Sequence, residues 1–151
     1  MIAVFGYYES AMDLSKFTRD ELILGGVALL LAIDLLFLPW FEISVGIGGL
    51  TLSVSSTATG SPDGWLGVLG VLASLALVGD LAFERLSSAQ LPAVGGSRAT
   101  TRLALAITAA VCVALKFLFH VHFDLFGIGF WAAVVLAVAL VVFARRLGPW
   151  T

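Results

Sequence analysis

Four long apolar runs constrain this chain more than any other feature, because each is close to the length of a helix that crosses a bilayer. About 20 residues, at a rise of about 1.5 Å each, cross roughly 30 Å of hydrocarbon. The composition agrees, since 60% of the 151 residues are hydrophobic and 12% are charged, against about 45–50% and 25% in soluble proteins. The runs are Leu22–Leu38, Trp65–Phe83, Leu103–Phe119 and Ile128–Phe143.

These runs predict an all-α membrane protein, a bundle of four transmembrane helices in a single domain, residues 1–151. We expect the helices at about 20–39, 65–84, 102–121 and 127–145, joined by an outer loop at 41–64 and an inner loop at 86–100. Residues 1–21 lack the basic start and apolar core of a signal peptide, so the first run should remain as an anchor.

The basic residues predict the orientation. Seven of the eight Lys and Arg residues flank the runs on one side, and residues 41–64 contain none. Because basic residues gather in cytoplasmic loops, we expect a multi-pass plasma membrane protein whose N- and C-termini are both cytoplasmic.

The outer loop alternates apolar and polar residues on both sides of Gly48-Gly49. Such alternation around a two-residue glycine turn is typical of a β-hairpin, so we expect a small extracytoplasmic hairpin; an unstructured polar loop is the alternative. The alternating apolar residues are Ile43, Val45, Ile47, Leu50, Leu52 and Val54.

Local signals mark both ends of the first helix. Thr18 and Glu21 have the spacing of a capping box, which predicts that the helix begins just after Thr18. Pro39 lacks a backbone donor, so the helix should end or kink there. Trp40 follows, and its amphipathic ring suits the membrane–water interface.

Ionisable residues inside the apolar runs are costly and should have partners. Asp34 and Lys116 lie about 18 and 20 Å from the inner boundary at the helical rise, so they predict an intramembrane ion pair between the first and third helices. The pair could fix helix packing or relay protons or ions, and the alternative is that Lys116 extends to the headgroups without contacting Asp34. Asp80 is predicted near the inner interface, where Arg85 or Arg102 could bind it.

The third helix carries two distinct patterns. Thr108, Cys112, Lys116 and His120 recur every four residues and predict a polar stripe. Alanines two positions away predict a small-residue face for close helix packing, which would place this helix at the centre of the bundle or against another copy; chance placement of a common residue is the alternative. These alanines are Ala106, Ala110 and Ala114.

His120, His122 and Asp124 are candidate metal ligands. Imidazole and carboxylate groups suit zinc, but alternate spacing needs an extended backbone, and the competing interpretation is a pair of interfacial histidines before a turn. The sequence has no phosphate-binding glycine loop, His-Glu-x-x-His or Gly-x-Ser-x-Gly motif. We therefore expect no cofactor, and the net charge of -2 offers no basic field for nucleic acid.

Three segments carry a resemblance to a known group. The run Asp13–Leu22, the stretch Phe37–Phe41 with its Leu-Pro-Trp-Phe order, and Gly64-Trp65-Leu66 together resemble a group of uncharacterised actinobacterial four-helix membrane proteins. The resemblance implies four-helix topology and a bacterial plasma membrane, and it implies no activity.

The leading functional hypothesis is a non-enzymatic membrane protein that acts as an interaction or accessory subunit or as a homo-oligomeric scaffold, with the outer hairpin as its recognition surface. Its expected partners are the lipid bilayer and either a second copy or another membrane protein. The runner-up is a small oligomeric transporter or channel that uses Asp34 and Lys116. A third hypothesis is a metal-dependent enzyme on the outer face.

Overall fold

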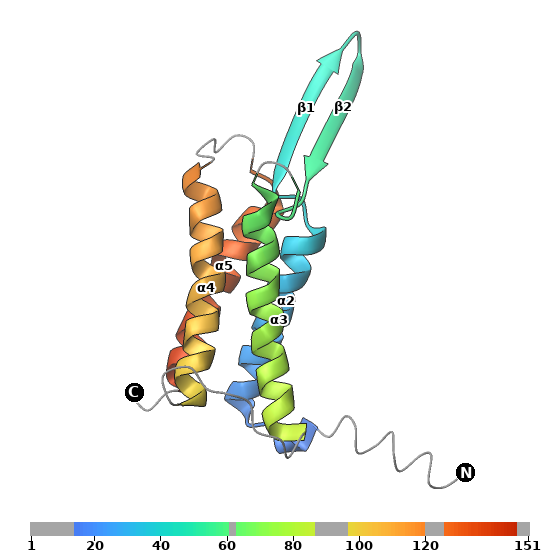
Figure 1. Cartoon of the computed structure of the whole chain (residues 1–151). Helices are drawn as coiled ribbons and strands as arrows, with labels where there is room; N and C mark the ends of the chain where they lie inside the picture. The colour runs from blue at the N-terminus through green and yellow to red at the C-terminus, as the bar shows by residue number, and fades with distance from the viewer. Residues whose placement is uncertain (1–13, 61–62, 87–96, 120–125, 148–151) are drawn as a thin grey trace, which may run out of the picture.

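The computed structural model describes residues 14–60, 63–86, 97–119 and 126–147, and most of these are helical (Figure 1). A short 3₁₀ helix, η1 (Leu14–Lys16), precedes four long helices. The helices are α2 (Arg19–Phe37), α3 (Gly64–Leu86), α4 (Arg98–Phe119) and α5 (Ile128–Arg146). Between α2 and α3, the strands β1 (Phe41–Ile47) and β2 (Leu50–Ser56) form a two-stranded antiparallel sheet.

Three of the four helices, α3, α4 and α5, are long and apolar enough to cross a membrane. The helix α2 has the same length as α5, 19 residues, but it differs in its charges. Three of them, Arg19, Asp20 and Glu21, lie in its first turn, and Asp34 lies near its other end.

The helices pack in a ring rather than around a central member. The extensive contacts join α2 to α3, α3 to α4, α4 to α5, and α5 back to α2. The expectation that the third helix is central is therefore wrong, since α4 occupies one corner of the ring. The ring leaves one side of every helix outward, so small residues on α4 do not place it at the centre.

The first helix begins and ends where local chemistry predicts. The Thr18 hydroxyl accepts a hydrogen bond from the Glu21 backbone N–H (3.3 Å), and the Glu21 carboxylate accepts one from the Thr18 N–H (3.0 Å), which confirms the capping box. The helix stops at Phe37 because the residue before a proline avoids helical dihedrals, and Leu38 is extended (ψ 146°). The chain then turns directly into β1.

The helix α4 begins earlier than expected, at Arg98 rather than near residue 102. Ser97 explains the earlier start, since its hydroxyl accepts a hydrogen bond from the Thr100 backbone N–H (3.2 Å). A serine just before the first turn accepts a hydrogen bond from a backbone N–H that has no partner within the helix. The inner loop is correspondingly shorter than predicted from hydropathy alone.

The hairpin predicted from the alternation is confirmed. The strands pair from Phe41 with Ser56 to Ile47 with Leu50, and the turn residues Gly48 and Gly49 have φ angles of 58° and 84°. Two consecutive positive φ angles define the turn that matches the twist of a hairpin, and glycine adopts them without steric cost. The hairpin projects beyond the end of the bundle (Figure 1).

One face of the hairpin is apolar and exposed, because cross-strand partners point to the same side of a sheet. We call it the hairpin face; its side chains are 48–72% exposed. The only charged residue of the strands, Glu42, pairs with Ser55 on the opposite face. The hairpin face consists of the pairs Ile43–Val54, Val45–Leu52 and Ile47–Leu50.

Candidate functional site

Asp34 is buried near the hairpin end of α2 and is bound by Trp40. The Trp40 Nε1–H donates a hydrogen bond to Asp34 Oδ2 (3.0 Å), and both residues are almost completely inaccessible to solvent. Asp34 is thus hydrogen-bonded to Trp40 rather than to Lys116. The other carboxylate oxygen, Oδ1, is buried and has no hydrogen bond within the part of the chain that the structure describes.

Lys116 is also buried, and its ammonium binds the chain that follows β2. Lys116 Nζ donates to the backbone carbonyls of Ala58 (2.5 Å) and Asp63 (3.3 Å). The same ammonium lies 6.0 Å from the centre of the Trp40 ring and 5.6 Å from that of Phe41, within the range of cation–π attraction. Asp34 of α2 therefore binds the Trp40 side chain before β1, whereas Lys116 of α4 binds backbone carbonyls after β2.

These interactions hold both ends of the hairpin. We call the residues Asp34, Trp40, Ala58, Asp63 and Lys116 the hairpin-base cluster. Trp40 immediately precedes β1, and its backbone N–H donates to Ser56 at the end of β2 (2.9 Å). Asp34 thus fixes the entry to the hairpin and Lys116 fixes its exit.

The start of α5 closes the cluster from a third side. The backbone N–H groups of Gly127 and Gly129 donate to the carbonyls of Trp40 (2.8 Å) and Pro39 (2.9 Å). A side chain at Gly127 would collide with the Pro39 carbonyl, so only glycine allows this approach. The Phe130 ring packs edge-on against Trp40, with the ring centres 5.5 Å apart.

Trp40 lies elsewhere than the sequence predicts. Its ring is buried in the bundle rather than facing the membrane–water interface, because its indole N–H finds an acceptor in Asp34. A buried tryptophan usually needs such a partner. Trp65 and Trp131, in contrast, are 55% and 51% exposed at the same end of the bundle.

No protein-family model, curated protein or solved structure matches this chain. What the chain can do is therefore inferred from its own geometry. The hairpin-base cluster joins α2 and α4 to the hairpin, and the start of α5 packs against it, so it is the candidate site.

The opposite end of the bundle contains an ion network, here the arginine network, that joins three helices. Arg98 and Arg102 of α4 bind the two oxygens of Asp80 (2.5 and 2.9 Å). Arg102 also contacts Glu84 and lies 3.7 Å from Glu21. Asp80 thus has Arg102 as one partner, and Arg98, rather than Arg85, as the other.

Glu21 connects α2 to this network just before the apolar run that starts at Leu22. Arg85 binds its carboxylate with two nitrogens (2.8 and 3.2 Å). Burial alone would raise the pKa of Glu21, but the hydrogen bonds from Arg85 and Thr18 outweigh it and lower that pKa from the ordinary 4.5. Both ends of α2 are therefore held by buried carboxylates.

The polar stripe of the third helix divides between two environments. Thr108 is exposed and its hydroxyl donates to the Ala104 carbonyl of its own helix (2.8 Å), whereas Cys112 and Lys116 are buried. Residues four apart drift by about 40° around a helix of 3.6 residues per turn. The stripe therefore rotates from the outside of the bundle into its interior, and His120 lies outside the described residues.

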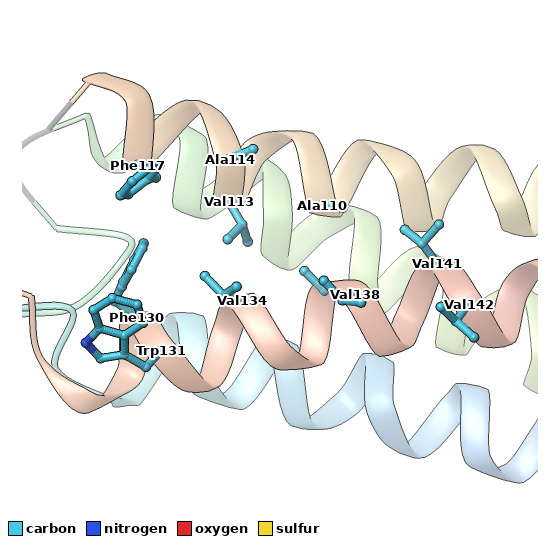
Figure 2. A pocket seen from close by; sticks show the side chains of 11 residues that line it. Ala110, Val113, Ala114, Phe117, Phe130, Trp131, Val134, Val138, Val141 and Val142 are labelled. Atoms are coloured by element: carbon cyan, nitrogen blue, oxygen red, sulfur yellow. The ribbon is translucent and has the colours of Figure 1, made fainter. Parts of the chain in front are cut away.

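The alanine pattern drifts around α4 in the same rotational sense, but it passes from the interior of the bundle to the outside. Ala106 is completely buried, Ala110 is half-buried and Ala114 is exposed. The last two line a groove of about 520 Å³ between α4 and α5, whose ends are marked by Phe117 and Val142 (Figure 2). Its lining contains no charged side chain, so it does not suit a charged ligand.

The proposed metal ligands His120, His122 and Asp124 also lie outside the described residues. Within the part that is described, the structure contains no group of three His, Cys, Asp or Glu side chains able to hold a metal. Trp40 and Ala58 were not predicted from the sequence as partners of the buried charges. An available signal was the tryptophan directly after the Pro39 helix stop, six residues beyond Asp34.

Proposed function

We propose that this chain is an integral membrane protein with four spans, α2 included. The support is the burial of the charges of α2: Glu21 and Asp34 are 4% and 1% exposed and face the bundle. The large outward side chains of α2 from Leu22 to Leu36 are apolar and 38–55% exposed, a surface that suits lipid. They are Leu22, Leu29, Leu30, Ile33 and Leu36.

The proposed orientation places the hairpin outside the cell and both termini in the cytoplasm of a bacterium. The arginine network and Arg145-Arg146 lie at the end opposite the hairpin, which favours this orientation under the positive-inside rule. A cysteine at Thr51 in a Cys112→Ala background should react with a membrane-impermeant maleimide from outside intact cells. A cysteine at Ser97 should react only after lysis, and the reverse pattern would invert the topology.

For its role, we propose a non-enzymatic interaction protein that presents the hairpin as a recognition surface. The observation that carries the proposal is the hairpin face, six apolar side chains left exposed on a ribbon that the buried hairpin-base cluster holds in position. Isolated two-stranded hairpins are marginally stable in water, and exposed apolar patches of this kind often mark binding sites.

Site-specific photocrosslinking tests this role. A photoreactive amino acid at Leu52, on the hairpin face, should give a defined protein adduct in native membranes. The matched position Ser53 lies next to it in sequence but on the opposite face, so it should give little or none. Equal yields from the two positions, or no adduct from either, would contradict the proposal.

A transporter or channel is the second candidate, favoured by the buried Asp34 Oδ1 atom, which makes no hydrogen bond to the described residues. Such an oxygen could take up a proton or a cation within the bundle. Purified protein in liposomes should then conduct protons or ions, and Asp34→Asn should abolish the flux. Flux no greater than in protein-free liposomes would eliminate this candidate.

A further inference from the structure

The hairpin face is continuous and without charge. Its three cross-strand pairs run from the middle of the ribbon to the Gly48-Gly49 turn. An unfolded chain exposes about 1.45 Å² per dalton, so exposed fractions of 48–72% correspond to roughly 600 Å² per copy. This area is large for an apolar patch on a monomer.

Lipid does not reach most of this surface in the proposed orientation. The ribbon continues beyond the end of the bundle, and each strand of 7 residues is about 23 Å long. The pair nearest the turn, Ile47 and Leu50, is 63% and 72% exposed and lies farthest from the helices. Lipid therefore does not cover this pair in the proposed orientation.

We propose that the cover is the hairpin of a second copy, packed face to face; this inference rests on the proposed recognition role. Two faces of roughly 600 Å² bury roughly 1,200 Å² together, which reaches the range of specific interfaces. A two-fold interface must be self-complementary, and an uncharged apolar face meets its own copy without like-charge repulsion. Glu42, the one charge, is on the opposite face.

Membrane geometry permits this arrangement. Two copies inserted in the same orientation can share a two-fold axis only along the membrane normal. The ribbon projects in that general direction from its bundle (Figure 1), so the hairpin faces of two copies can stack as two sheets about 10 Å apart. The central pair, Val45 and Leu52, then lies at the middle of the dimer contact.

Cysteine crosslinking between two differently tagged copies tests the dimer. In a Cys112→Ala background, Val45→Cys and Leu52→Cys should each join the two tags through a bismaleimide linker that spans about 10 Å, the spacing of two stacked sheets, with a yield several-fold above that of Ser53→Cys on the opposite face. When the number of copies per lipid nanodisc is counted by single-molecule fluorescence, Leu52→Asn should weaken self-association about tenfold or more. Ser53→Asn should leave self-association unchanged.

Three results separate the two proposals. Joined tags at positions 45 and 52, absent at 53, support the dimer. If Leu52 instead photocrosslinks to a different protein and purified wild-type protein is monomeric, the dimer is overturned while the recognition role stands. If neither the tags nor any other protein are joined, both proposals fail. Circular dichroism of each variant confirms that the helices are retained.

Discussion

Trp40 donates its indole hydrogen to Asp34, six residues earlier, across the turn from α2 into β1 (3.0 Å). The carboxylate of Asp34, predicted from the sequence to pair with Lys116, thus holds the start of the hairpin. Lys116 holds its end, through the Ala58 carbonyl. The charges buried near the hairpin therefore position an exposed element.

Substitutions of Trp40 and Asp34 should have coupled effects on the free energy of unfolding. Trp40→Phe removes the donor and leaves Asp34 buried without a partner, which should cost about 1–3 kcal/mol. Asp34→Leu removes the acceptor as well. The double variant should be less destabilised than the sum of the single variants, as measured by thermal unfolding in detergent; strict additivity would mean that the bond contributes nothing.

Lys116→Met should loosen the exit of the hairpin without unfolding the helices. The variant removes the donor to the Ala58 and Asp63 carbonyls, at a cost of about 1–3 kcal/mol. Hydrogen exchange should accelerate at residues 54–60 and stay unchanged in α5. The matched control is Lys16→Met, since Lys16 is exposed at η1; equal effects of the two variants would refute the assigned role.

Two glycines of α3 should respond in opposite directions to alanine. A side chain at Gly67 would collide with the Ala58 carbonyl, whereas one at Gly79 meets no atom within 4 Å. Gly67→Ala should therefore destabilise by about 1–3 kcal/mol, and Gly79→Ala should stabilise by roughly 0.5–1 kcal/mol through helix propensity. Melting temperatures of both variants check this; a stabilising Gly67→Ala would contradict the close packing.

Acid should weaken the arginine network through Glu21. Folding lowers the pKa of Glu21 from its ordinary value of 4.5. The ionised Glu21 carboxylate therefore stabilises the folded state fully above pH 4.5, and this stabilisation is lost as the pH falls through the lower pKa of the folded state. The melting temperature of the wild type should fall over this acid range, and Glu21→Gln should show a shallower fall. Parallel curves would show that Glu21 does not contribute to the acid sensitivity.

Features that depend on neighbouring residues were predictable. The Thr18–Glu21 capping box, the helix stop before Pro39 and the strand alternation around Gly48-Gly49 each rely on groups a few residues apart. These preferences act between residues close in sequence, so they do not depend on how distant segments pack. They were sufficient to locate the two ends of α2 and the two strands of the hairpin.

Partners of the buried charges were not predictable in the same way. Matching depths of Asp34 and Lys116 made a pair available, but depth does not specify rotation around a helix or the path of a loop. The chain reverses after Pro39 and brings the Trp40 donor back to Asp34, and the Ala58 carbonyl reaches Lys116 only because Gly67 leaves room for it.

The sequence by itself determined the helical class, the hairpin and its apolar face, because hydropathy and backbone preference act over short distances along the chain. Only the tertiary structure decided that the helices form a ring, that Trp40 is buried, and that Asp34 and Lys116 bind the two ends of the hairpin. A buried polar group takes the nearest partner that the packed backbone offers, and that partner exists only once distant segments are in place.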